Sequence, residues 1–483
     1  VQTCALPILF ASGSQLLSVN GNIAIYANLT SAAAAVYDGI SLTGATIKST
    51  GSGNITLSGK GGAGANTAET NRGINIVSSS LIQTGSGSIT LTGNAGLYNG
   101  TGDYCIAGIN LDTSDIRSTS GNISLTGNGS STGTATVGDC DGVNLEIASD
   151  ITTGGVGLVR LIGTAYRNGE GFDSNDNPTN TISAGSGGLT IEGRSVNSVA
   201  VTIAGPGNTP GNTTAVLNAA SGPISLLGIS ETSDSVELAN LRLGDGTVTN
   251  LTITATGGSV TASGDDDGVW LSNVSSTITG TLTINSTSGD TGETEILAGT
   301  TLNAATINIT ATTGNSDALN IISSTLDASG NLTIDSSCSG GTGDRDGLIL
   351  NAATLTADGT LTVNATATAD GEGLQLETGT AVTAATVILN ATVGATGSEA
   401  LVLNDSSTVT ATGAAGVTVN TTGSVGNGLV LNTNSTLEAT SGPLTVDCSR
   451  PIAINLGTVE SGNAALSLTA FRIRSEEHTS ELQ

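Results

Sequence analysis

The chain repeats itself at a nearly constant interval. Two segments that begin with glycine read GISLTGATIKSTGSGNITLSG from Gly39 and GINIVSSSLIQTGSGSITLTG from Gly73. Two more begin at Gly108 and Gly142, so the interval is 34 or 35 residues. A fixed period of this length is the signature of stacked repeats rather than of independent globular domains.

A second array follows the same pattern at intervals of 23 to 29 residues. Each of its repeats opens with a short aliphatic segment such as GLIL or GLVL, and these segments begin at Gly268, Glu295, Ala318, Gly347, Gly373, Ala400 and Gly428. Between the arrays the pattern is less regular, and the long polar stretch from Ala165 to Asn180 predicts a protruding loop. The expected regions are therefore a first array over 9–165, irregular repeats over 166–265 and a second array over 266–465.

Each repeat contains three short segments in which apolar and polar residues alternate. Alternation at period two indicates strands with one buried face, and Gly, Asn and Asp between the segments supply turns. Three four-residue strands are too few to enclose a core, but copies stacked about 4.8 Å apart can do so. We therefore expect an all-β fold, a single elongated right-handed parallel β-helix (solenoid) with three short strands per coil.

Composition favours this fold over its competitors. Aromatic residues make up only 2% of the chain, with one Trp, which is too few to fill several globular cores. Tandem sandwiches and propeller blades usually carry aromatic signatures and have longer periods, and the leucine-rich repeat motif does not recur. Each inward Val, Ile or Leu contributes roughly 1.5–3 kcal/mol on burial, so a stack of such coils needs no aromatic core.

Both ends of the chain differ from the rest. Residues 1–8 read VQTCALPI and residues 474–483 read RSEEHTSELQ, which carries the only histidine, His478. GTTCAGACGTGTGCTCTTCCGATC encodes the first segment, and its reverse complement lies within AGATCGGAAGAGCACACGTCTGAACTCCAG, which encodes the second. That duplex resembles the adapter of short-read sequencing libraries. We therefore interpret both ends as translated adapter and the chain as an internal, metagenomic fragment of a longer reading frame.

The net charge of the chain disfavours some classes of binding partner. The chain has a formal net charge of −28 with 12 Lys and Arg residues, which disfavours binding to nucleic acid or to anionic membranes. No apolar run approaches the 18 residues of a membrane-spanning helix.

The units SGNITLSG, SGSITLTG and SGNISLTG, together with GTLTVNATA later in the chain, resemble the repeat regions of large bacterial exoproteins, the filamentous-haemagglutinin-like and autotransporter adhesins. The resemblance covers most of residues 20–465. It implies a secreted β-helix on the bacterial surface that binds host or environmental glycans, matrix proteins or other copies of itself. The expected function is a non-catalytic, adhesin-like stalk.

The alternative is a carbohydrate-active β-helix enzyme, a polysaccharide lyase or a glycoside hydrolase. Outside the adapter-like ends there is no histidine, which removes Ser-His and Cys-His nucleophiles and histidine zinc sites. Carboxylates for glycosidase chemistry are present in Asp265–Asp267 and as Glu170, Asp173 and Asp176, with Arg167 as a basic partner. Solvated loop acids are the commoner explanation of such residues.

A column of acids is the candidate metal site. Two residues before the first inward aliphatic, the second array places Asp267, Asp317, Asp346, Glu372 and Glu399, and Glu295 lies within one residue of that position. Stacked carboxylates repel each other, and calcium between neighbouring coils would relieve the repulsion. The commoner arrangement is a corner at which each acid accepts a hydrogen bond from a turn, and Asn427 at the same position favours it. Asp173–Asn177 resembles the opening of a calcium loop, but Pro178 stands where that loop has glycine.

Cysteines and outward apolar residues complete the candidate sites. Cys105 and Cys140 lie one repeat apart, so we expect them to be adjacent and able to form a disulfide, whereas Cys338 and Cys448 should not pair. Four outward positions in the second array carry large apolar residues, which either form a contact strip or are covered by a loop; these are Trp270, Ile349, Val402 and Val430.

Overall fold

A computed structural model of the 483-residue chain describes most of the two arrays. The described residues are 2–4, 7–28, 35–64, 70–97, 106–130, 140–166, 168–174, 179–205, 215–258, 267–289, 292–340, 345–368, 370–394, 399–423, 426–455, 457–462, 464–470 and 472–475. These residues form strands and turns and contain no helix, which confirms the all-β class. None of them belongs to a helix long and apolar enough to cross a membrane.

The chain divides into two compact units. Unit 1 comprises Val1–Gly258 and Asn273–Thr279, and unit 2 comprises Ser259–Ser272 and Gly280–Gln483. The strands recur in sets of three, and we call three consecutive strands, such as β8, β9 and β10, a rung.

Unit 1 consists of three ladders of parallel strands. The first ladder contains β2 (Ile8–Phe10), β5 (Ile40–Thr43), β8 (Ile74–Val77), β11 (Ile109–Leu111), β14 (Val143–Leu145), β17 (Phe172–Ser174), β20 (Val201–Ala204) and β23 (Val236–Leu243). The second contains β3 (Gln15–Ser18), β6 (Thr46–Ser49), β9 (Leu81–Thr84), β12 (Asp115–Ser118), β15 (Asp150–Thr153), β18 (Thr181–Ala184) and β21 (Ala215–Ala219). The third contains β1 (Gln2–Cys4), β4 (Ile23–Ala27), β7 (Ile55–Lys60), β10 (Ile89–Asn94), β13 (Ile123–Asn128), β16 (Leu158–Thr164), β19 (Gly188–Ser195), β22 (Ile224–Ser230) and β24 (Leu251–Thr256).

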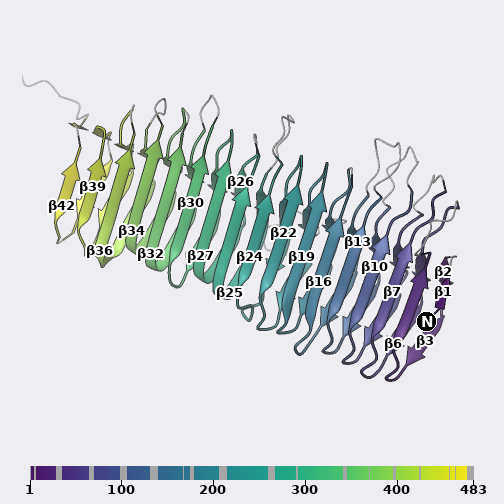
Figure 1. Cartoon of the computed structure of the whole chain (residues 1–483). Coiled ribbons are helices and arrows are strands. Elements are labelled where there is room, and N and C mark those ends of the chain that lie inside the picture. The colour runs from purple at the N-terminus through teal and green to yellow at the C-terminus, as the bar shows by residue number, and fades with distance from the viewer. Residues whose placement is uncertain are drawn as a thin grey trace, which may run out of the picture. The chain divides into compact units, whose positions relative to one another are not determined.

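Corresponding residues of successive repeats are paired directly. Ile89 of β10 pairs with Ile55 of β7 on one side and with Ile123 of β13 on the other. Figure 1 shows β7, β10, β13, β16 and β19 side by side in this order. The sequence period is therefore the distance along the chain from a strand to its neighbour in the sheet.

The core of each rung is made of aliphatic residues at alternate positions. In the rung of β5, β6 and β7, the side chains of Ile40, Leu42, Ile47, Ile55 and Leu57 are fully buried, and the residues between them are partly exposed. This alternation is what a strand with one buried face requires.

Unit 2 follows the same plan, but its second and third segments often join into one long strand. β32 (Thr354–Ala367) pairs through its first half with β29 (Thr325–Ala328) and through its second half with β30 (Leu332–Cys338). The joined strands also include β27 (Thr301–Thr313), β34 (Ala381–Val393) and β36 (Thr408–Thr422). In the rungs after β36 the second and third strands are separate again, as β38 (Thr436–Ala439) and β39 (Leu444–Cys448), and then β41 (Thr458–Ser461) and β42 (Leu466–Thr469). Residues 280–287 of β25 (Val269–Thr287) also belong to this unit.

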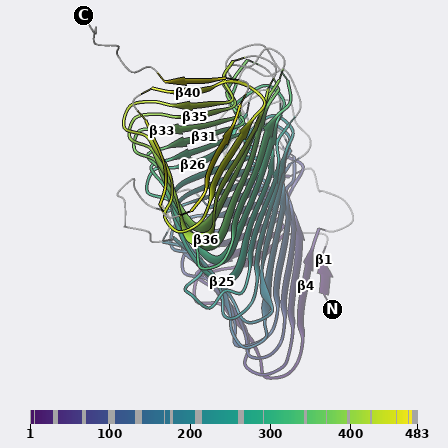
Figure 2. The same cartoon turned by 90° about the vertical axis from the view of Figure 1, so that its left-hand side faces the viewer.

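The first ladder of unit 2 starts with Val269–Ser272 of β25 and continues through seven further strands. These are β26 (Thr294–Leu297), β28 (Leu319–Ile322), β31 (Leu348–Asn351), β33 (Leu374–Glu377), β35 (Leu401–Leu403), β37 (Leu429–Leu431) and β40 (Ile452–Ile454), with β43 (Ile473–Ser475) paired to β40. Figure 2 shows β26, β31, β33, β35 and β40 stacked in order.

The expected protruding loop from Ala165 to Asn180 is wrong for the described part of that stretch. Phe172 is fully buried and opens β17, which pairs with β14 and β20 like any other first strand. The sequence of this segment, GFDS, has one large apolar residue, whereas the first strands of other repeats have two aliphatic residues. A single aromatic ring supplies the buried apolar volume of β17, so the aliphatic pattern that marks other first strands is missing there.

The two adapter-like ends take part in the ladders. β1 lies within residues 1–8 and pairs with β4, and β43 overlaps residues 474–483 and pairs with β40. His478 lies outside the described residues.

Candidate metal site

Acidic residues at one corner of the repeats link successive rungs. The corner position is the second residue before the first inward aliphatic of a first strand, as Asp346 stands before Leu348. At this position a carboxylate oxygen accepts a hydrogen bond from the backbone N–H of the corner residue one rung further on. The pairs are Asp38 with Arg72 (2.9 Å), Asp141 with Glu170 (2.9 Å), Asp317 with Asp346 (2.7 Å) and Asp346 with Glu372 (2.7 Å).

This corner accounts for most of the acid column expected in unit 2. Asp267 accepts the backbone N–H of Glu293 at 2.8 Å, and Glu399 accepts the side-chain N–H of Asn427 at 3.2 Å. The hydrogen-bonded corner was the commoner of the two arrangements weighed for these acids, although the donor belongs to the next rung rather than to the same turn. The assignment of Glu295 is wrong, because it pairs with Trp270 within the strand and lies three residues beyond the corner.

Protonation limits the repulsion along this column. Burial, followed by the neighbouring charge of Glu372, raises the pKa of Asp346 to about 9. Asp346 and Glu372 therefore bind a proton more readily than isolated acids, so that the two adjacent corner acids need not both be ionised.

Three carboxylates gather at another place, on the first ladder of unit 1. Ligand oxygens of Asp141, Glu170 and Asp173 all lie within 4.8 Å of one another. Among the described residues this is the only group of three or more Asp, Glu, His or Cys side chains close enough to hold a metal ion. Oxygen ligands alone suit a hard cation such as Ca²⁺ or Mg²⁺.

Local folding explains why these three meet. Asp141 and Glu170 occupy the corner position of successive rungs and are joined by the Glu170 N–H bond to Asp141 Oδ1. Asp173 is the outward residue of β17, three residues after Glu170, and pairs with Asn144 of β14. Asp141 and Asp173 are buried, and Glu170 is half-buried.

The carboxylates raise one another's proton affinity. Burial and then the charge of Asp141 raise the pKa of Glu170 to about 8, although the hydroxyl of Ser198 donates to Glu170 Oε1 at 2.9 Å. Burial and the charge of Glu170 also raise the pKa of Glu237 above its ordinary value. The site concentrates more negative charge than its buried surroundings favour.

Thr202 extends the site by one rung. It pairs with Asp173 on one side and with Glu237 on the other, so the three side chains leave the same face of the ladder. Thr202 is 4% exposed, and its hydroxyl oxygen has no hydrogen-bond partner among the described residues. A buried hydroxyl without a partner is costly unless a ligand satisfies it.

The residues considered for an enzyme site are only partly brought together. Glu170 and Asp173 lie in the cluster, whereas Arg167, Asp176, Asp265 and Asp266 lie outside the described residues, as does most of Asp173–Asn177. The sequence reasoning missed Asp141, although it shares the corner position that the second array made visible.

The expected apolar contact strip is not continuous. The register places Glu295, Asn320 and Gln375 in the same outward column as Trp270 and Ile349. Val402 and Val430 are only 7% and 6% exposed and pack in a cluster with Ala453. These two valines are therefore too deeply buried to form a contact surface, while Trp270 and Ile349 are half-buried.

The disulfide prediction remains open. Cys105 lies outside the described residues. Cys140 is fully buried and packs against Ile106, as the 34-residue register of Ile109 with Val143 requires. Cys338 and Cys448 are buried free thiols.

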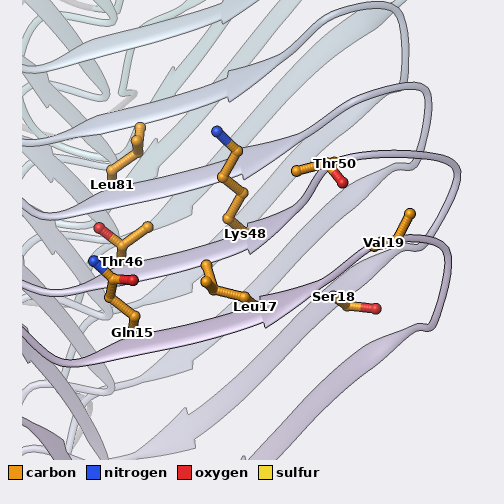
Figure 3. A pocket seen from close by; sticks show the side chains of 8 residues that line it. All are labelled: Gln15, Leu17, Ser18, Val19, Thr46, Lys48, Thr50 and Leu81. Carbon is orange, nitrogen blue, oxygen red and sulfur yellow. The ribbon is translucent and has the colours of Figure 1, made fainter.

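A surface hollow of about 580 Å³ lies on the second ladder of unit 1. Figure 3 shows its lining side chains on neighbouring strands, with Gln15 and Leu17 on β3, Thr46 and Lys48 on β6 and Leu81 on β9. Its lining includes one charged residue, Lys48, and no carboxylate, so it offers none of the ligands of the acidic cluster.

Comparison of the chain with known protein families, with curated proteins and with solved structures finds no match in any of the three.

Proposed function

We propose that the chain is a right-handed parallel β-helix that serves as a non-catalytic, adhesin-like stalk of a secreted bacterial surface protein. The observation that carries the proposal is the direct pairing of corresponding residues from rung to rung, as in Ile55, Ile89 and Ile123. Such a ladder repeats the same inward aliphatic pattern over many repeats, which suits an extended scaffold. The right hand follows from the chirality of parallel β-crossovers.

Surface chemistry supports a scaffold that binds through many weak contacts. Many outward positions of the third strands carry Ser, Thr or Asn, and asparagine side chains form chains of hydrogen bonds across rungs. Asn420 donates to Asn390 at 2.8 Å, and Asn390 donates to Asn364 at 2.7 Å. The proposed partners are glycans, matrix proteins or further copies of the chain.

The fold can be tested by cross-linking on the outward face. Thr90 pairs with Ser124, and Ser124 pairs with Arg160 on the following rung. In a parallel ladder, Thr90→Cys with Ser124→Cys brings Cα atoms about 4.8 Å apart and should form a disulfide on mild oxidation. Thr90→Cys with Arg160→Cys spans two rungs and should not. Mass spectrometry of the linked peptides distinguishes these bonds from the native thiols, and equal cross-linking of both pairs contradicts the stacked register.

The alternative, a carbohydrate-active enzyme, draws on the acidic cluster. A Glu170 with a pKa of about 8 could donate a proton near neutral pH. However, ligand oxygens of the cluster lie within 4.8 Å of one another, which is closer than the roughly 5–5.5 Å between the carboxyl groups of retaining glycosidases and the roughly 6.5–9.5 Å of inverting ones. Asp141 and Asp173 are also more than nine-tenths buried, which denies access to a polymer.

A binding screen run beside a cleavage assay decides between the two functions. The stalk proposal expects binding to glycans or matrix proteins and no cleavage of acidic or neutral polysaccharides. Turnover that disappears in Arg167→Gln or Asp173→Asn overturns the stalk proposal in favour of the enzyme.

A further inference from the structure

We propose that Asp141, Glu170, Asp173 and Thr202 form a calcium site that ties three rungs of unit 1 together. The site goes beyond the stalk function and does not depend on it. The four side chains come from the rungs of β14, β17 and β20, which are consecutive in the first ladder.

The first argument is the geometry of the donors. Carboxylate oxygens of Asp141, Glu170 and Asp173 lie within 4.8 Å of one another. Two ligands of one calcium ion, each 2.3–2.6 Å from it, are separated by at most about 5 Å. The three carboxylates therefore already fit around a single ion.

The second argument is the hydroxyl of Thr202, which is independent of the acids. It is 96% buried, since 4% of the residue is exposed, and its oxygen has no hydrogen-bond partner among the described residues. Thr202 pairs directly with Asp173, so the two side chains project from the same face about 4.8 Å apart. A buried, unpartnered hydroxyl oxygen on the residue paired with Asp173 is a further hard ligand, and a cation held by Asp173 would satisfy it.

The third argument concerns the choice of ion. The donors are all oxygens, which excludes a soft-metal site. Calcium accepts irregular shells of six to eight oxygens, whereas magnesium demands near-octahedral geometry and keeps several waters. Ligands fixed by the spacing of strands are irregular and mostly buried, and they therefore favour calcium.

The test is calcium titration of the whole chain by isothermal calorimetry after removal of divalent ions with a chelator. The wild-type chain should bind one Ca²⁺ with a dissociation constant below about 1 mM, in the range of extracellular modules, and more tightly than Mg²⁺. Asp173→Asn should weaken binding at least tenfold. Asn fits the position, because Asn144 occupies it one rung earlier.

Two further variants separate ligation from folding. Thr202→Val keeps the shape of the side chain and removes its oxygen, so it should weaken Ca²⁺ binding severalfold while circular dichroism stays unchanged. Asp346→Asn makes the same substitution in the corner column of unit 2 and should leave calcium affinity unaltered. Absence of calcium binding by the wild-type chain overturns the site, as does equal binding by the wild-type and Asp173→Asn chains. Loss of binding in Asp346→Asn alone would also overturn it, since the ion would then belong to the other column.

Discussion

Replacement of Asp346 by asparagine should stabilise unit 2, and the gain should depend on pH. The carboxylate is 5% exposed, and its Oδ1 accepts the N–H of Glu372 at 2.7 Å. Asparagine keeps a carbonyl oxygen for that hydrogen bond but carries no charge at any pH. The variant therefore removes the cost of ionising a buried acid and retains the corner contact.

The sign follows from the protons that each state binds. Burial and the charge of Glu372 hold the pKa of Asp346 in the folded chain well above its unfolded value of about 3.9. Between these values the folded state holds a proton that the unfolded state has lost, so stability falls as pH rises. That contribution is fully present below about pH 4 and is lost by about pH 9, whereas Asp346→Asn is insensitive to this titration.

The magnitude can be bounded from the rung spacing. Unit charges about 4.8 Å apart repel by roughly 0.9 kcal/mol at the dielectric of water and by roughly 3.5 kcal/mol at an effective value of 20. We therefore expect Asp346→Asn to raise the free energy of unfolding by about 1–3 kcal/mol at pH 9 and by less than about 1 kcal/mol at pH 4.5.

Urea unfolding followed by circular dichroism at pH 4.5, 7 and 9 measures this difference. Asp358→Asn is the matched control, because Asp358 is exposed in the same unit and loses the same charge. The control should change stability equally little at each pH. A gain in Asp346→Asn that is the same at pH 4.5 and pH 9, or a loss at pH 9, would refute the reasoning.

Three further changes test the packing of the ladders. Phe172→Ala should cost about 3–5 kcal/mol in unfolding experiments, and Phe172→Leu clearly less, because the fully buried ring is the large apolar side chain that β17 contributes to the core; equal costs would contradict that role. Gly93→Ala should lower the melting temperature strongly, since a Cβ there would lie 2.0 Å from the carbonyl oxygen of Gly108; an unchanged melt would contradict this contact. Asn390→Asp should destabilise unit 2 by about 1 kcal/mol at pH 7 and less at pH 4, because it removes the donor to Asn364 and adds a charge; a pH-independent effect would contradict the ladder.

Sequence periodicity was sufficient to predict the strands and most of their register. The pairs Leu348 with Leu374 and Leu401 with Leu429 join residues that stand at the same position in successive repeats. A stacked repeat makes this inference reliable, because a shift of one residue would turn the aliphatic side chains to the outer face.

The acidic cluster could not be predicted in the same way. Asp141 and Asp173 belong to rungs whose spacing along the chain is 29 residues, as Val143 with Phe172 shows, instead of the 34 or 35 of the first array. Because the interval changes and GFDS has a single aromatic residue in place of two aliphatics, the repeat pattern did not identify the strand that carries Asp173. The raised pKa of Glu170 could not be predicted either, since burial and neighbouring charge depend on which rungs are adjacent.

The two arrays differ in sequence because their third strands approach the next rung at different distances. In unit 1 one register position near the end of the third strands is usually glycine, and a Cβ added there would meet a backbone carbonyl oxygen of the next rung at 2.3 Å or less, as at Gly59, Gly93, Gly127 and Gly163. In unit 2 the equivalent residues of β27, β32 and β34 are Ala311, Ala365 and Ala391, which are buried without such a constraint. The third-strand motif ends in SG or TG in the first array and in NA or TA in the second. This difference therefore indicates how closely the third strand approaches the first strand of the next rung. The repeats of the two arrays are therefore not interchangeable, even though their strands pair in the same order.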